Sequence, residues 1–189
     1  MKNDTRKRIL IIATVILIFF CLVYLYTFFH EGGHALVALI YGQKTDRFVL
    51  GLNGHVSHSG GNFNRTGEAL LSSAGVLLPV AVLTVALLFY NRKIKNNIYH
   101  FIYFEISVTI ISSLFAWIAI PVISLFTAPP PGDDVTRFMD ASGLHPLLVS
   151  VAALLLMLLP VLIAYKKGLI SRFSECIKDL GNKASQTRS

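Results

Sequence analysis

The sequence predicts an all-α polytopic membrane protein with about four transmembrane helices and a short β-hairpin between the first and the second. Of its 189 residues, 54% are hydrophobic and only 14% are charged, whereas soluble proteins carry roughly 25% charged residues. Four apolar runs make up about half of the chain, at residues 9–29, 69–90, 99–126 and 146–165. Each run reaches the ~18–20 residues that a helix needs to cross a bilayer, and none shows the short alternating strands of a membrane β-barrel.

The first apolar run continues almost without interruption from residue 9 to residue 41. As one helix it would be about 50 Å long, against about 30 Å of hydrocarbon. We therefore expect it to tilt, project or break, with Gly32-Gly33 as the flexible point. The run is too long for a cleavable signal peptide and lacks a small-x-small cleavage site, so we read it as a membrane span.

Two local signals follow the first span. Residues 48–59 predict a short β-hairpin, in which Asn53-Gly54 forms a type I′ turn. Thr66 is expected to cap the helix of the second span. Each later span contains one proline, which is typical of membrane helices arranged around an interior site, at Pro79, Pro121 and Pro160.

The positively charged residues predict the topology. Of the 17 Lys and Arg, four precede the first span, three lie between the second and third spans, and six follow the fourth. The others lie in the two remaining loops, at Lys44, Arg47, Arg65 and Arg137. The positive-inside rule places both termini and the loop 91–97 in the cytoplasm, with segments 42–67 and 127–145 toward the outer side. The net charge of +7 is then explained by the orientation of the chain in the membrane and by contact with anionic lipid, rather than by binding to nucleic acid.

We expect a single transmembrane domain over residues 1–168. Residues 169–189 are expected to be a basic cytoplasmic tail, either an amphipathic helix or a loose segment. Cys21 lies in the first span and Cys176 near the far terminus, so the two cysteines suggest no disulfide framework.

Residues 30–34 form an HExxH pattern inside a helical run. On a helix, His30 and His34 project from one face a single turn apart, so that both imidazoles can reach one Zn²⁺ at ~2.0–2.1 Å. Glu31 lies about 100° round the helix, where its carboxylate can take a proton from a zinc-bound water and pass it to the leaving amine. Ionisable groups in or beside an apolar run are costly unless partnered. This favours a functional site over a polar helix end that faces water.

A catalytic zinc needs a third protein ligand. Of the acids that the predicted topology places on the side of His34, Asp133 and Asp134 follow the rigid proline run 129–131 and open a short helix. The alternative is that this pair only caps the helix and complements its dipole. The other acids on that side are scattered, at Asp46, Glu68 and Asp140.

This constellation resembles the site-2 protease family of intramembrane zinc metalloproteases. The resemblance rests on HEGGHA at residues 30–35, on the small residues SSAG at 72–75 that open the next span, and on a late Asp before the final span. Larger members carry Leu-Asp-Gly around the third ligand, where this chain has GDD at residues 132–134. It is closer to the small single-domain relatives, in which an Asp precedes a short helix that ends in Thr-Gly or Ser-Gly. Counting to Ser142-Gly143 favours Asp134 as the third ligand, with Asp133 as the alternative.

The resemblance implies an enzyme that hydrolyses a peptide bond in or near the transmembrane segment of a membrane-protein or membrane-associated peptide substrate. One Zn²⁺ per chain would be held by His30, His34 and Asp134, with Glu31 as general base. The topology predicted from the positive charges places this active site toward the outer side. The edge of the hairpin could pair with an unwound substrate strand, as the family is thought to present substrates. The oligomeric state is left open.

Three other functions are weighed. A non-catalytic membrane protein, or pseudoprotease, would use the metal site for structure or substrate binding, but it would not need Glu31. A di-iron oxygenase would use His55 and His58 with the HExxH histidines, but the chain has only six histidines and two of them are isolated. A transporter is disfavoured because four spans without an inverted repeat offer little scaffold.

Overall fold

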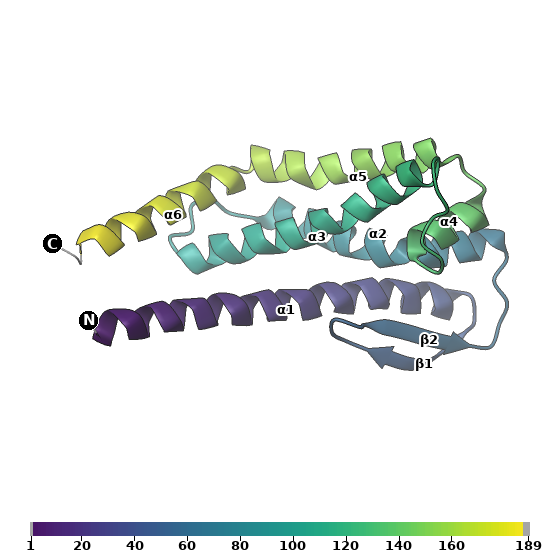
Figure 1. Cartoon of the computed structure of the whole chain (residues 1–189), viewed down its shortest axis with the longest axis horizontal. Helices are drawn as coiled ribbons and strands as arrows, with labels where there is room; N and C mark the ends of the chain where they lie inside the picture. The colour runs from purple at the N-terminus through teal and green to yellow at the C-terminus, as the bar shows by residue number, and fades with distance from the viewer. Residues whose placement is uncertain (1, 187–189) are drawn as a thin grey trace.

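The computed structural model describes the backbone of residues 2–186 and, within that range, all side chains except those of residues 2–4, 7, 8, 11, 15 and 180–186. Within this range the chain forms six helices and one two-stranded sheet, in the order α1 (Lys2–Ile40), β1 (Lys44–Val49), β2 (His55–Ser59), α2 (Arg65–Phe89), α3 (Asn97–Ile123), α4 (Asp134–Ser142), α5 (Pro146–Lys166) and α6 (Leu169–Gln186). Both termini lie at one end of the bundle, while the hairpin and α4 lie at the other (Figure 1). The predicted fold class is confirmed.

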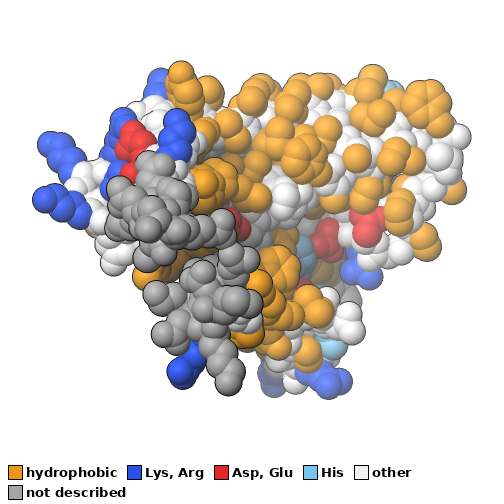
Figure 2. Space-filling view, turned by 60° about the vertical axis from the view of Figure 1, so that its left-hand side comes forward, with side chains coloured by type: hydrophobic (Ala, Val, Ile, Leu, Met, Phe, Trp, Pro, Cys, Tyr) orange, Lys and Arg blue, Asp and Glu red, His pale blue; other side chains and the backbone are white. Residues whose placement is uncertain are grey.

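Four helices in the described part of the chain are long and apolar enough to cross a membrane. They cover Ile12–Ile40, Arg65–Phe89, Asn97–Ile123 and Pro146–Lys166. In Figure 2 hydrophobic side chains cover much of the visible face, whereas most Lys and Arg lie at its left and lower edges. The protein is therefore a multi-pass membrane protein.

α2 is the central helix of the bundle. Half of its spanning window is buried inside the protein, compared with 12% of that of α1, and it contacts α1, α3, α4 and α5. Its buried apolar residues recur every three or four positions, so that they form one continuous face. This face packs with residues of α3, α4 and α5 in the main core, whose α2 members are Val76, Val80, Leu83 and Leu87.

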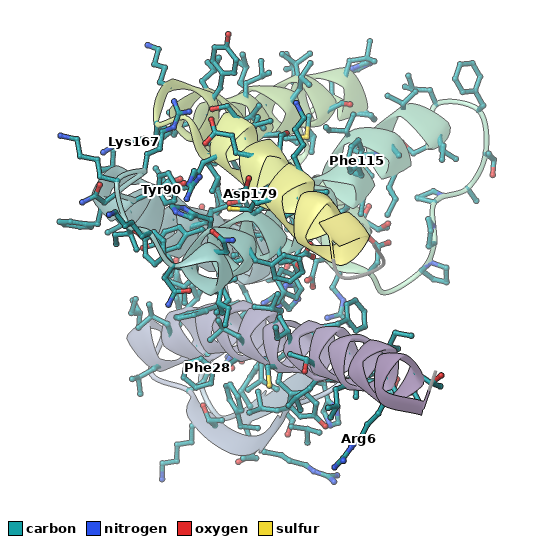
Figure 3. All side chains as sticks on the ribbon, turned by 90° about the vertical axis from the view of Figure 1, so that its left-hand side faces the viewer. Arg6, Phe28, Tyr90, Phe115, Lys167 and Asp179 are labelled. Atoms are coloured by element: carbon teal, nitrogen blue, oxygen red, sulfur yellow. The ribbon has the colours of Figure 1, made fainter. Side chains whose placement is uncertain are left out.

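α1 forms a separate layer with the hairpin below the other helices, as the end-on view in Figure 3 shows. The helix does not break at Gly32-Gly33, contrary to one of our expectations. A Cβ added to Gly33 would lie 2.1 Å from the Ala74 carbonyl oxygen, whereas one added to Gly32 would meet only the Leu78 side chain, at 3.9 Å. Gly33 therefore lets the backbones of α1 and α2 touch, as small residues commonly do between membrane helices.

The hairpin pairs β1 with β2 in antiparallel register, from Lys44 opposite Ser59 to Val49 opposite His55. Residues 50–54 connect the strands, so the two-residue turn that we expected is wrong. Its type I′ geometry would need positive φ at both central residues, but among residues 50–54 only Gly51 has it, at 124°.

Gly54 instead allows the hairpin to pack closely against α1. A Cβ at Gly54 would lie 2.1 Å from the Thr27 side-chain methyl group. The Thr27 hydroxyl lies 3.3 Å from the Gly51 carbonyl oxygen. The connection between the strands is therefore held against the middle of α1.

Side chains cap the helices that lead into and out of the loops near this end. Asn64, rather than Thr66, caps α2: its side-chain oxygen accepts a hydrogen bond from the Gly67 amide at 2.8 Å. At the start of α5, the Nδ1 atom of His145 accepts one from the Leu147 amide. These contacts provide acceptors for amide groups that the helices leave unpaired.

α6 packs on the end of the bundle that carries the termini. The Phe173 ring stacks on Phe104 of α3 at a centroid distance of 3.7 Å. Glu175 forms ion pairs with Arg172 and with Arg92 of the α2–α3 loop, and the Arg172 hydrogen bond holds the pKa of the Glu175 carboxyl below its usual value. Residues 169–179 of the expected tail thus contact the transmembrane helices.

Tyr90, the residue after the last turn of α2, packs at the same end of the bundle. It lies near Lys167, which donates a hydrogen bond to the Leu88 carbonyl (Figure 3). Burial raises the pKa of Tyr90 to about 12, so the phenol keeps its proton and donates to Nδ1 of the fully buried His100 at 2.7 Å. The Nε2 atom of His100 donates to the Ile94 carbonyl, also at 2.7 Å. This histidine is fully engaged in structural contacts.

The adjacent glycines of α1 give a matched pair of variants. Gly33→Ala forces α1 and α2 apart, so we expect it to destabilise the protein by about 1–3 kcal/mol, the usual cost of overpacking. Gly32→Ala meets little steric resistance and gains helix propensity, so its unfolding temperature should stay the same or rise. Thermal unfolding followed by circular dichroism in detergent compares the two, and equal unfolding temperatures would contradict the role given to Gly33.

Candidate metal centre

Three side chains from two helices converge at the end of the bundle away from the termini. His30 and His34 lie one turn apart on α1, and Asp134 is the first residue of α4. The Asp134 Oδ2 atom lies 3.3 Å from Nε2 of His30 and 3.2 Å from Nε2 of His34. The two Nε2 atoms are 3.3 Å apart. Among the described residues, this is the group whose side chains could hold a metal ion.

The triangle of donor atoms fits a tetrahedral zinc ion. Zinc binds imidazole nitrogen at ~2.0–2.1 Å and carboxylate oxygen at ~2.0–2.2 Å, so two ligand atoms on a tetrahedron lie about 3.3–3.4 Å apart. The three observed separations agree with this value to about 0.1 Å. Two imidazoles and one carboxylate also leave a fourth position open, as in catalytic rather than structural zinc sites.

Hydrogen bonds orient both imidazoles. The Nδ1 atom of His34 lies 2.8 Å from the Leu71 carbonyl of α2, which can only accept a hydrogen bond. Nδ1 of His34 therefore carries a hydrogen, so Nε2 is the ring nitrogen that remains available to a metal ion. The Nδ1 atom of His30 lies 3.3 Å from the Tyr26 hydroxyl. Partners of this kind fix the tautomer of metal-binding histidines.

The two neighbouring aspartates have different contacts. Asp133 is the N-cap of α4: its Oδ1 atom accepts from the amides of Val135 and Thr136, and Oδ2 contacts the Thr136 hydroxyl. Both of its carboxylate oxygens are therefore occupied. Asp134 begins the helix proper, and its Oδ2 atom faces the two histidines.

Asp134 is held as a carboxylate. Its partial burial disfavours the charged form, but hydrogen bonding to His30 and then to His34 outweighs burial and lowers the pKa of Asp134 far below its usual value. An ionised carboxylate at this position supplies the negative charge that a divalent cation requires.

The small residues of α2 form the surface on which the histidines lie. A Cβ at Gly75 would come within 2.5 Å of Nε2 of His34 and 2.7 Å of Cε1 of His30. No larger residue fits there without displacing the imidazoles. The SSAG segment noted in the sequence therefore brings α2 against the HExxH turn.

A cavity of about 890 Å³ opens in front of the three side chains. Glu31, which is 6% exposed, lines it, and no hydrogen bond within the described residues engages its carboxylate. His55 and His58 of β2 line the cavity but lie outside the donor triangle. In Figure 2 acidic side chains lie beside a histidine in a recess of the surface. Charged residues complete the lining, at Arg65, Glu68, Arg137 and Asp140.

The fold and the cavity define a multi-pass helical membrane protein with a His-His-Asp cluster suited to a metal ion. The family model described as Peptidase M50B-like matches residues 7–129, and the chain belongs to this family, the site-2 protease family. The match covers α1 to α3 and ends before Asp134, so the place of this carboxylate comes from the geometry. No curated protein and no solved structure gives a significant match to the chain.

Several residues around the centre have no distinct signal in the sequence. Tyr26 precedes His30 by four residues, a spacing that suggests a shared helix face, but apolar spans often contain tyrosine. The partner of His34 is the backbone carbonyl of Leu71, which no side-chain pattern reveals. Gly75 lies in the SSAG segment, whose composition predicts close helix packing without indicating what packs there.

The aspartate pair yields a direct prediction. Asp134→Asn removes the anionic donor, so we expect zinc affinity to fall by at least about 100-fold, beyond the cost of losing an outer partner. Asp133→Asn should keep wild-type zinc content, because asparagine is about as effective as aspartate at a helix N-cap. Metal analysis of the two purified variants measures both effects. If only Asp133→Asn lost zinc, Asp133 rather than Asp134 would be the third ligand.

Proposed function

We propose that the protein is an intramembrane zinc metalloprotease that hydrolyses a peptide bond in or near the transmembrane segment of its substrate. The observation that carries the proposal is the triangle of His30, His34 and Asp134, whose spacing suits tetrahedral zinc, in a chain of the M50B-like family. The open cavity in front of the triangle supports a catalytic rather than a structural metal.

His30, His34 and Asp134 would hold the zinc ion, which would supply Lewis acidity by lowering the pKa of water toward ~7 and polarising a carbonyl group. Glu31 then accepts a proton from the attacking water and returns it to the leaving amine. Its carboxylate suits this role because it lines the same cavity and has no hydrogen bond to the described residues. The Leu71 carbonyl holds His34, and Asp134 is the first residue of a helix that Asp133 caps, so little reorganisation would accompany the reaction.

The membrane setting explains why the cavity is bordered by a strand. A substrate helix in lipid protects its backbone hydrogen bonds, and a peptidase must provide partners for the backbone that it unwinds. β2 lines the cavity with His55, Val56 and His58, and Gly54 lies just before this strand. Pairing of an unwound substrate segment along this strand would supply main-chain hydrogen bonds regardless of substrate sequence.

We also propose that the termini are cytoplasmic and that the cavity faces the outer side. The cavity is lined in part by residues of the hairpin and α4. These elements lie at the end of the bundle opposite the termini (Figure 1). The basic loop 91–96 and α6 lie together through the Arg92–Glu175 ion pair. The positive-inside rule assigns this end to the cytoplasm.

Glu31→Gln tests the catalytic proposal. We expect the variant to bind about one zinc per chain, as the wild type does, but to cleave about 10²–10⁴-fold more slowly, the usual contribution of a general acid–base group. Cleavage of a pool of synthetic single-span peptides in liposomes is followed by mass spectrometry. Glu105→Gln, which removes another carboxylate from a span, is the matched control and should cleave normally.

The same experiment separates the alternative function. A pseudoprotease would bind zinc in both the wild type and Glu31→Gln, and neither protein would cleave any peptide of the pool. A wild type without zinc, even when the metal is supplied during purification, would overturn both readings.

Orientation has its own test. In a background with Cys21 and Cys176 replaced by alanine, Ser57→Cys on β2 should react with a membrane-impermeant thiol reagent added to intact cells. Lys178→Cys on α6 should react only after the membrane is permeabilised. Reaction in the opposite order would place the cavity on the cytoplasmic side.

A further inference from the structure

We propose that Arg137 of α4 is a further catalytic residue, whose guanidinium donates a hydrogen bond to the carbonyl oxygen of the peptide bond that is hydrolysed. The proposal rests on the proposed function, because it requires that a peptide bond be cleaved in the cavity beside the metal centre. It gives a role to a charged side chain of the cavity lining that the steps above do not use.

Arg137 lies next to the metal centre because α4 carries both this arginine and Asp134. The two residues are three positions apart, so they share one face of the helix and are separated by about 4.5 Å along its axis. Both side chains line the cavity. A Cβ added to Gly132 would lie 3.9 Å from the Nη2 atom of Arg137. The guanidinium is therefore turned toward the loop that leads into Asp134.

The charge of Arg137 has no structural partner in the described part of the chain. Its guanidinium forms neither an ion pair nor a hydrogen bond with any described residue. A cation near the start of a helix also gains nothing from the helix dipole, which favours negative charge at that end. The side chain is exposed, so its N–H donors remain available to a bound substrate.

Few positive charges lie on the side of the membrane that the cavity is proposed to face. Segments 42–67 and 127–145 contain four Lys and Arg, and of these Arg65 and Arg137 line the cavity. Arg65 begins α2, about 15 Å along the helix axis from Gly75, where α2 meets the imidazoles. Of the two arginines, Arg137 is thus the one whose side chain can reach a group bound beside the metal centre.

Hydrolysis creates the charge that Arg137 would bind. When the water oxygen adds to the peptide carbon, Glu31 takes a proton from the water, and an electron pair of the C=O double bond moves onto the carbonyl oxygen. The C–N bond then breaks, the double bond forms again, and Glu31 returns the proton to the leaving nitrogen. A guanidinium binds the charged oxygen more strongly than the neutral carbonyl, so it lowers the barrier more than it tightens substrate binding.

The experiment compares Arg137→Gln with the wild type as full chains in liposomes, with a single-span peptide that the wild type cleaves. We expect kcat to fall by about 10²–10³-fold with little change in KM, the usual effect of removing one donor to the charged oxygen. Arg137→Lys keeps the charge but loses the planar fork of donors, so it should recover part of the rate. Zinc content should match the wild type in both variants.

A binding measurement tests the same contact without catalysis. A phosphinic peptide carries a negatively charged tetrahedral group in place of the cleaved peptide bond, and Arg137→Gln should bind it at least about 10-fold more weakly. In a Glu31→Gln background, where the substrate peptide is not consumed, the same change should leave substrate affinity unaltered. A merely structural role for Arg137 does not predict this difference.

Two other arginines provide comparisons. Arg47→Gln is the matched control, because it removes the same charge from β1, outside the cavity lining, and it should keep the wild-type kcat. Arg65→Gln removes a charge from the cavity lining at a greater distance from the metal centre. Its loss of kcat should be smaller than that of Arg137→Gln, because a hydrogen bond depends on contact, whereas the field of the cavity does not.

Each outcome decides the proposal. Wild-type kcat and phosphinic-peptide affinity in Arg137→Gln would overturn the role of Arg137 and leave the proposed function intact. Equal losses in Arg65→Gln and Arg137→Gln would also overturn it, because the charge of the cavity would then be responsible. Loss of zinc or of the folded protein in Arg137→Gln would show a structural role instead. A wild type that cleaves no peptide would overturn this inference together with the proposed function.

Discussion

The contact between Gly33 and the Ala74 carbonyl determines how closely α1 and α2 approach, and the metal centre depends on that distance. Because the backbones touch there, the Leu71 carbonyl reaches His34 and the imidazoles lie against Gly75. Lipid provides no hydrophobic gain for pairing two apolar helices, so close packing and hydrogen bonds must stabilise the pair. A side chain at Gly33 or Gly75 would remove the close packing and the hydrogen bonds at the point where the ligands lie.

Polar groups at the centre are satisfied to different degrees, and the difference matches the roles proposed for them. Both histidines and Asp133 have hydrogen-bond partners that fix their orientation. Glu31 is buried and lines the cavity, yet no hydrogen bond within the described residues holds its carboxylate. A buried carboxylate without a hydrogen-bond partner is energetically costly in a membrane protein, and such groups usually have a function. Proton transfer during hydrolysis is such a function, because it requires a group that is free to bind and release a proton.

Composition and the length of the apolar runs predicted the spans, because bilayer thickness leaves a direct mark on the sequence. The hairpin was predicted from Asn53-Gly54, and the structure has the hairpin but joins its strands by the longer connection 50–54. These signals could not predict how elements far apart in the chain pack. Gly54 is typical of a tight turn, but the structure uses it against Thr27, a contact that depends on where the hairpin lies. His30 and His34 come together through helix geometry alone. Asp134 joins them from a hundred residues away, and only the three-dimensional structure shows its neighbour Asp133 engaged as the cap.

The continuity of α1 explains why a glycine pair sits inside the HExxH motif without making it flexible. Tyr26, His30 and His34 follow one another at intervals of four residues, so they share a face only while the helix keeps its regular turn. A break at Gly32-Gly33 would rotate His34 relative to His30 and separate the two Nε2 atoms that now lie 3.3 Å apart. The burial of Gly33 against α2 restrains the backbone at its most permissive point. Glycine therefore serves this site through the absence of a side chain, and the packing that this absence allows suppresses the flexibility that glycine would otherwise give.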